Sequence, residues 1–164
     1  MRTLTYNREK AIEYAYKYAL NRNPDYYNFD SLGGNCTNFI SQCIFAGSLV
    51  MNYTPVLGWY YISLKRRAPA WTGVNELYKF LTTNLGVGPF GIQTEKENAL
   101  IGDIIQFANS SNHYYHTSII TKIDRGKIFV TTNTSDALNR PLEHYSFAKH
   151  RCIHILGVRK STEE

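Results

Sequence analysis

The run Gly33-Gly34-Asn35-Cys36 is the part of the sequence best suited to covalent chemistry. Two glycines allow a tight backbone approach, and a cysteine then begins an apolar helix. At that position the free first-turn N–H groups and the positive end of the helix dipole stabilise a thiolate, and the same groups can donate to a developing oxyanion. Cys36 is therefore a candidate nucleophile. A small buried residue on the helix stripe is an equally good interpretation of this spacing alone.

A thiolate nucleophile needs a general base, and His116 is the best placed of the five histidines. It stands at the start of a strand with an apolar body, directly after a flexible loop, which is a good mount for a base. A loop-edge histidine without a role is the alternative. The other histidines lie in a polar loop, in irregular sequence or within the last strand: His113, His144, His150 and His154.

A third side chain should orient the imidazole, and the segment after the next strand offers Asn133 and Asp136. A two-residue turn at Arg125-Gly126 pairs position 118 with 133. Asn133 is then a same-face diagonal neighbour of His116, about 7 Å away between backbones. A three-residue turn would move Asn133 to the other face of the sheet. The pairing argument favours Asn133 and leaves Asp136 as the alternative.

The three cysteines give no sign of a disulfide or a metal site. Cys36 and Cys43 lie two turns apart on one predicted helix, about 10 Å between Cα atoms, which is too far for a disulfide. The sequence holds no CxxC pair, so we expect no structural zinc. We expect at least one free thiol, no metal and no cofactor.

The hydrophobic periodicity predicts helices first and strands afterwards. The predicted helices are residues 7–21, 36–46 and 72–83, and the predicted strands are residues 103–107, 116–123, 127–133 and 151–158. This order indicates the α+β class, and a length of 164 residues allows one domain, which we assign to residues 1–164.

Composition and charge exclude several classes of function. The net charge of +5 is scattered, without the basic stripe or motif of a nucleic-acid-binding protein. The apolar runs are too short to cross a bilayer, and the polar N-terminus carries no visible signal peptide. We expect either an intracellular protein or a chain that begins after a removed segment. The oligomeric state stays open.

A longer set of motifs resembles a known family. The string GGNCTNFISQCIFAG, with YNREKAIEYAYKYA before it and ALIGDIIQF, YYHTSIIT and TNTSDALNRPL after it, resembles the bacterial amidase-domain family, over about residues 6–159. That family is grouped with the papain-like cysteine hydrolases and is related to the CHAP and NlpC-type cell-wall enzymes. The resemblance implies a papain-like fold, with N-terminal helices packed on a C-terminal antiparallel sheet.

The resemblance also implies roles for single residues. Cys36 matches the family nucleophile and His116 its base, and Asn133 stands where relatives often place a histidine. Asn35 replaces an expected Asp, which removes a negative charge beside the thiolate or costs an orienting contact. We expect Asn35 and the tryptophans Trp59 and Trp71 to line the substrate groove, although aromatic residues of a small domain more often form its core.

The resemblance implies hydrolysis of amide bonds through a thioester, with bacterial cell-wall peptide as the expected substrate. The family setting is extracellular or cell-wall, while a cytoplasmic location stays open for this chain. Two alternatives remain: a non-catalytic module that binds peptidoglycan or peptide on the same fold, and acyl transfer to an amine in place of water.

Overall fold

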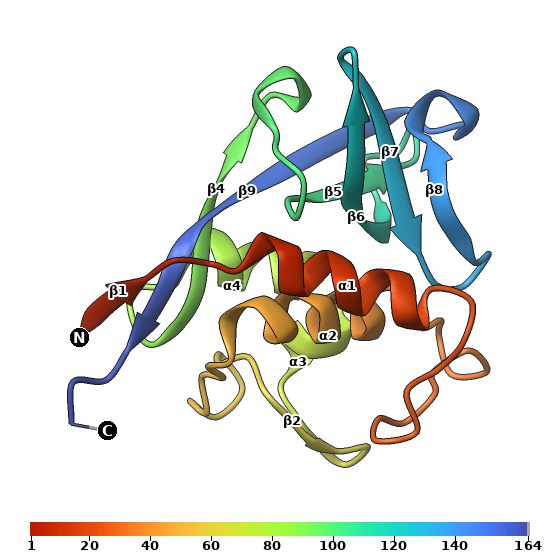
Figure 1. Ribbon diagram of the computed structural model, residues 1–164. Helices are drawn as coiled ribbons and strands as arrows, with labels where there is room; N and C mark the ends of the chain where they lie inside the picture. The colour runs from red at the N-terminus through yellow and green to blue at the C-terminus, as the bar shows by residue number, and fades with distance from the viewer. Residues whose placement is uncertain (164) are drawn as a thin grey trace.

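The computed structural model describes residues 1–163 and packs four α-helices against a large antiparallel sheet, with a short hairpin on the side of the helices away from the sheet (Figure 1). The helices are α1 (Arg8–Tyr18), α2 (Cys36–Ser48), α3 (Pro69–Thr72) and α4 (Val74–Thr83). The strands of the sheet are β1 (Arg2–Leu4), β4 (Gly88–Thr94), β5 (Ile104–Ala108), β6 (Tyr114–Asp124), β7 (Lys127–Thr132), β8 (Ala137–Pro141) and β9 (Lys149–Lys160). The separate hairpin consists of β2 (Tyr61–Ser63) and β3 (Arg66–Arg67).

The sheet runs in the order β1-β9-β5-β6-β7-β8, and β4 pairs with the far part of β9. Its centre is made of the four strands that the sequence predicts. Three further strands of the sheet were not predicted: β1, β4 and β8. All three are edge or flanking strands without a full hydrophobic alternation, so they depend on pairing with a neighbour.

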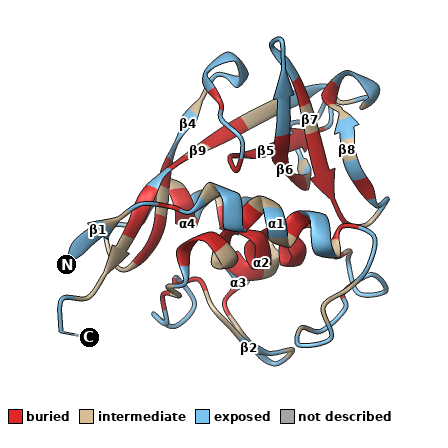
Figure 2. Cartoon of the chain, viewed as in Figure 1, coloured by how far each residue is buried: buried red, intermediate tan, exposed pale blue. Residues whose placement is uncertain are grey.

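Helix α1 begins where the sequence indicates, because the Asn7 side chain accepts a hydrogen bond from the Lys10 N–H. Helix α2 is buried on almost every side, including its polar residues (Figure 2). It ends at Leu49, whose left-handed backbone closes the last turn through an N–H donated to the Phe45 carbonyl. A helix buried all round must satisfy its polar side chains internally, and this shapes the site at its N-terminus.

The two faces of the sheet carry two separate apolar clusters. Ile119 and Ile153 point to the face covered by α1, α2 and α4, where they pack with Ile40 and Ile44 of α2. Phe107 and Cys152 belong to the opposite face, in a smaller cluster closed by the segment 142–147. Side chains along a strand alternate between these faces, so a residue's position in the strand decides which cluster it joins.

The β6–β7 hairpin shows how that alternation is reset. Its turn is the predicted two-residue turn Arg125-Gly126, with both residues at positive φ and Asp124 paired with Lys127. The register then shifts between Ile120 and Lys122, so Thr121 is an extra residue in β6. Beyond this bulge Ile119 pairs with Thr131, and position 118 therefore faces 132 rather than 133.

The observed architecture confirms the α+β prediction in its coarse form: a mixed fold with a large antiparallel sheet and few helices. Among the described residues, none of the helices has both the length and the apolar character that a membrane crossing requires.

Candidate active site

Cys36 is the first residue of α2, as the sequence predicts. The glycines before it adopt the left-handed backbone that favours glycine, with φ of 86° at Gly33 and 98° at Gly34. Asn35 makes no side-chain capping bond to the helix, and within residues 1–163 neither Cys36 N–H nor Thr37 N–H has a protein acceptor. These donors are therefore available to a negatively charged atom beside the sulfur.

Cys36 differs from the other two thiols in its environment. All three cysteines are free, but Cys36 is 9% exposed, whereas Cys43 and Cys152 are completely buried. Burial raises the pKa of Cys43 well above its usual range and raises the pKa of Cys152 to about 12. Only Cys36 combines some solvent access with a helix N-terminus.

A network of side-chain amides fixes the backbone before Cys36. Asn35 Nδ2 donates to Asn133 Oδ1 at 3.0 Å, and Asn35 Oδ1 accepts from Asn38 Nδ2 and from the Phe29 N–H. Asn133 Nδ2 in turn donates to the Ala19 carbonyl at 2.8 Å. Asn35 is 2% exposed and Asn133 1%. Both predicted site residues therefore lie beside Cys36, where they connect α1, β7 and α2 rather than contact solvent.

An ion-pair clasp closes the loops over this network. Arg22 binds Asp30 and Asp136, with shortest distances of 3.0 and 2.8 Å. Thr134 Oγ1 accepts from the Asn35 N–H at 2.7 Å and lies 3.1 Å from Asp30 Oδ1. Burial alone would raise the pKa of Asp30, but the Arg22 guanidinium outweighs it and holds this pKa below its usual value. Asp136, the alternative orienting residue, is thus bound to Arg22.

His116 lies on the other face of the sheet from α2. Its neighbour Thr117 reaches α2 through a 2.8 Å hydrogen bond between Thr117 Oγ1 and Thr37 Oγ1, whereas the His116 ring stacks on Phe107 at 5.6 Å. Its Nε2 lies 3.1 Å from Thr132 Oγ1. Burial lowers the pKa of His116 to about 4, so the ring is neutral at physiological pH. Within residues 1–163 no hydrogen bond joins His116 to Cys36.

The bulge at Thr121 explains why Thr132, and not Asn133, is the partner of His116. The predicted pairing of positions 118 and 133 is wrong by one residue, because regular pairing from the turn ends at Lys122. Thr132 thereby becomes the same-face diagonal neighbour of His116, and Asn133 faces α1 and Asn35. Sequence reasoning missed Thr132, since no residue type in β6 marks the bulge.

Trp59 and Trp71, expected to line a substrate groove, are completely buried. Trp59 Nε1 donates to Ser41 Oγ, Trp71 Nε1 donates to Asn38 Oδ1, and the two rings lie 4.7 Å apart. They form an aromatic layer under α2, so direct contact with a surface-bound substrate is at odds with this structure. The core interpretation accounts for them, because each indole N–H needs a buried acceptor and finds one on α2.

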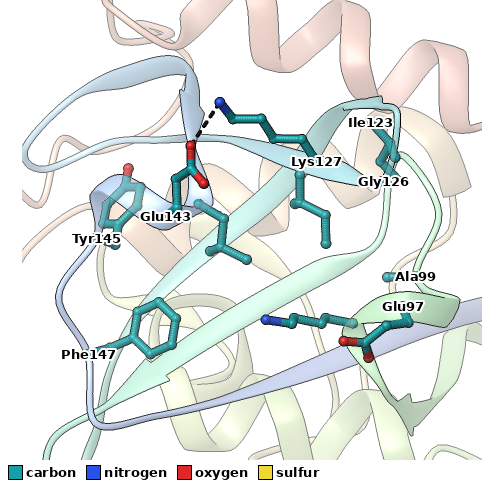
Figure 3. A pocket seen from close by; sticks show the side chains of 11 residues that line it. Glu97, Ala99, Ile123, Gly126, Lys127, Glu143, Tyr145 and Phe147 are labelled. Atoms are coloured by element: carbon teal, nitrogen blue, oxygen red, sulfur yellow. Dashed lines mark ion pairs between the residues drawn. The ribbon is translucent and has the colours of Figure 1, made fainter.

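The far face of the sheet carries a cavity of about 380 Å³ (Figure 3). Leu142, Tyr145 and Phe147 line it, and the exposed ion pair of Lys127 and Glu143 spans its rim at 2.8 Å. Cys36 is not among its lining residues. Among residues 1–163, no three His, Cys, Asp or Glu side chains converge as metal ligands.

Comparison with known proteins identifies the family. The chain is 32% identical over 143 residues to the uncharacterized protein YhbB of Bacillus subtilis, which covers 85% of this chain and 45% of the relative. It is 26% identical over 162 residues to the uncharacterized protein YjcM of the same organism, which covers 94% of this chain and 37% of the relative. The chain therefore spans less than half the length of either relative. No solved structure matches it. Residues 5–156 match the family described as "Putative amidase domain", so the chain belongs to this amidase family, whose name indicates an amide hydrolase.

Proposed function

We propose that this protein hydrolyses amide bonds with Cys36 as its nucleophile, on a papain-like fold related to CHAP and NlpC-type enzymes. The observation that carries the proposal is the setting of Cys36. It is the one thiol of the three that keeps any exposed surface, 9%, it stands at the start of α2, and its neighbouring N–H groups have no protein acceptor within residues 1–163. A thiolate needs that environment, and a structural cysteine gains nothing from it.

The reaction follows the general course of acyl transfer. The Cys36 thiolate attacks the amide carbonyl carbon, and the N–H groups of Cys36 and Thr37 stabilise the oxyanion of the tetrahedral intermediate. The intermediate collapses to a thioester as the C–N bond breaks and the amine leaves with a proton. Water then attacks the thioester, which releases the acid and restores the thiol.

His116 is the proposed base, and the geometry supports it less than it supports Cys36. In its favour, the ring is neutral, and Thr132 contacts one ring nitrogen, which leaves Nδ1 uncommitted. Against it, the ring stacks on Phe107 on the face away from α2. Proton transfer from Cys36 then requires the ring to turn around the start of β6, next to the irregular pairing where Ala108 faces Tyr114.

The proposed substrate is the peptide part of the bacterial cell wall. This follows from the family resemblance and agrees with the net charge of +5, which favours an anionic surface. Such a substrate places the site of action outside the cytoplasmic membrane.

The test is hydrolysis of purified peptidoglycan and of soluble muropeptides, followed by mass spectrometry of the released fragments. We expect new amine and carboxyl ends with the wild-type chain and none with Cys36→Ala. Cys152→Ala is the matched control, because it removes a thiol from the opposite face. A Cys36→Ala variant that still releases the same fragments would overturn the proposal.

The position of His116 favours a second function, a non-catalytic module that binds peptidoglycan or peptide. In that case a nucleophile without an adjacent base would give no turnover, and co-sedimentation with peptidoglycan would be equal for wild type and Cys36→Ala. Turnover that depends on Cys36 would exclude this second function.

A further inference from the structure

A chain of buried hydrogen bonds leads from the surface residue Arg151 to the Cys36 sulfur. Arg151 Nε donates to Gln106 Oε1 at 2.8 Å, and Gln106 Nε2 donates to Thr117 Oγ1 at 3.2 Å. Thr117 Oγ1 lies 2.8 Å from Thr37 Oγ1, which lies 3.8 Å from Cys36 Sγ. Thr37 is 1% exposed, while Thr117 and Gln106 are completely buried.

The orientation of the Gln106 amide is fixed by its other partners. Its Oε1 must face Arg151, because a guanidinium can only donate. Its Nε2 must face the Val74 carbonyl, 2.9 Å away, because a carbonyl can only accept. Gln106 can therefore only donate to Thr117.

The direction of the remaining bonds follows from counting protons. Within residues 1–163, Thr117 Oγ1 has two side-chain partners, Gln106 and Thr37. Since Gln106 donates, the one acceptor left for the Thr117 proton is Thr37 Oγ1. Thr37 Oγ1 then accepts from Thr117, and the acceptor left for its own proton is the Cys36 sulfur. Buried hydroxyl groups rarely leave a proton unpaired, so the chain ends as a donor to sulfur.

Arg151 is held rigidly at the start of this chain. Its guanidinium lies 3.8 Å from the ring centroids of both Tyr78 and Tyr114, and its Nη2 donates to Asn75 Oδ1 at 2.9 Å. It forms no ion pair with a carboxylate within residues 1–163. Its positive charge is thus not neutralised locally and polarises the amide that it contacts.

We propose that Arg151, Gln106 and Thr117 are positioning residues that direct the Thr37 hydroxyl to donate to the Cys36 sulfur and so stabilise its thiolate. This inference rests on the proposed role of Cys36 as nucleophile. A hydroxyl donor favours the charged sulfur over the neutral thiol, and cooperative polarisation along the chain strengthens the effect. The charged groups around the site are Arg22, Asp30 and Asp136 of the clasp, and the titratable group on the opposite face is the neutral His116.

The test is the rate of Cys36 alkylation by iodoacetamide as a function of pH, measured by mass spectrometry on the intact folded chain. The midpoint of this profile reports the thiolate equilibrium, whereas the limiting rate at high pH reports access to the sulfur. In Thr37→Val we expect the midpoint to move upward and the rate at pH 6.5 to fall about 3- to 10-fold, with the limiting rate unchanged. Thr37→Ser keeps the hydroxyl and should restore the wild-type midpoint.

Arg151→Met tests the far end of the chain and should lower the rate at pH 6.5 about 2- to 4-fold. Its matched control is Arg159→Met, which removes another ring-stacked guanidinium of β9, one that donates to the Asn84 carbonyl. Arg159→Met should leave the midpoint unchanged. A folded Thr37→Val or Arg151→Met variant with a wild-type midpoint would overturn the inference.

The two proposals fail differently. A midpoint that responds to Thr37 without any hydrolysis of peptidoglycan would uphold the hydrogen-bond chain and contradict the hydrolase. Hydrolysis that needs Cys36 but is unchanged in Thr37→Val would uphold the hydrolase and contradict the hydrogen-bond chain.

Discussion

The two faces of the sheet differ in how their polar groups are satisfied. On the face covered by α2, Thr37, Asn35 and Asn133 belong to continuous hydrogen-bond networks that surround Cys36. On the opposite face, His116 lies among the aromatic rings of Phe107 and Tyr145 with one side-chain hydrogen bond, to Thr132. The first face surrounds the Cys36 thiol with polar groups, and the second keeps the His116 imidazole neutral among apolar ones.

This difference depends on a single extra residue. Without the bulge at Thr121, the pairing that starts at the Arg125-Gly126 turn would place Asn133 on the same face as His116. With the bulge, Asn133 joins the Cys36 side and Thr132 the His116 side. Bulges commonly re-aim a side chain next to a functional site, and here one separates the two residues that the motif suggests as partners.

The largest expected effect is the difference in alkylation rate between the thiols on the two faces of the sheet. At pH 7.5 we expect Cys36 to react with iodoacetamide at least about 100-fold faster than Cys152, because the pKa of Cys152 is raised to about 12 by burial. Cys43 should be equally slow. Peptide mapping after limited labelling measures all three, and labelling in urea is the control. Equal labelling in the folded state would contradict the assignment of Cys36.

The second effect is the loss of folding stability in acid that the buried His116 causes. Its pKa is lowered to about 4 in the folded chain against 6.5 for an ordinary histidine, so between these values the unfolded chain binds a proton that the folded chain does not. Stability should therefore fall as the pH drops from 6.5 to 4, by about 2–3 kcal/mol in total. Urea unfolding of wild type and His116→Phe measures this slope.

His116→Phe should remove most of this pH dependence, whereas His113→Gln, in an exposed loop, should leave it unchanged. A wild-type slope in His116→Phe would mean that other groups cause the acid sensitivity.

The third effect is the loss of Asn133. Asn133→Ala leaves Asn35 Nδ2 and the Ala19 carbonyl without their partner, and we expect peptidoglycan turnover to fall about 10- to 100-fold, or about 1.4–2.7 kcal/mol in the barrier. The physical reason is that Asn133 holds the backbone before Cys36 through Asn35 and the Ala19 carbonyl, not that it orients His116. Alkylation of Cys36 should change in parallel. Asp136→Ala, which removes one carboxylate of the Arg22 clasp, is the comparison variant. Full activity in Asn133→Ala would show that the amide network does not position Cys36.

The smallest effect is expected for Thr132→Val, which removes the hydroxyl that contacts His116 Nε2 at 3.1 Å. Turnover should fall about 3- to 10-fold if His116 is the base, because the ring loses its orienting partner. Cys36 alkylation should stay at the wild-type rate, since Thr132 lies on the opposite face. A change in alkylation as large as that of Asn133→Ala would mean that the faces are not independent.

Several elements can be predicted from local features of the sequence. Asn7 predicts the start of α1, the glycines at 33 and 34 predict the turn into α2, and Arg125-Gly126 predicts the hairpin turn. Each is a short-range effect of side-chain capping or of positive φ. The edge strands could not be predicted in this way, because β4 and β8 form through pairing with β9 and β7.

The sequence by itself determined that Cys36 begins a helix and that His116 lies in a strand, since both follow from periodicity and turn residues within a few positions. Only the tertiary structure decided which face each side chain occupies. One bulged residue inverts the alternation of a strand, and no residue type signals it. The tertiary structure also buried Trp59 and Trp71, because packing against α2 outweighs any surface role for their rings.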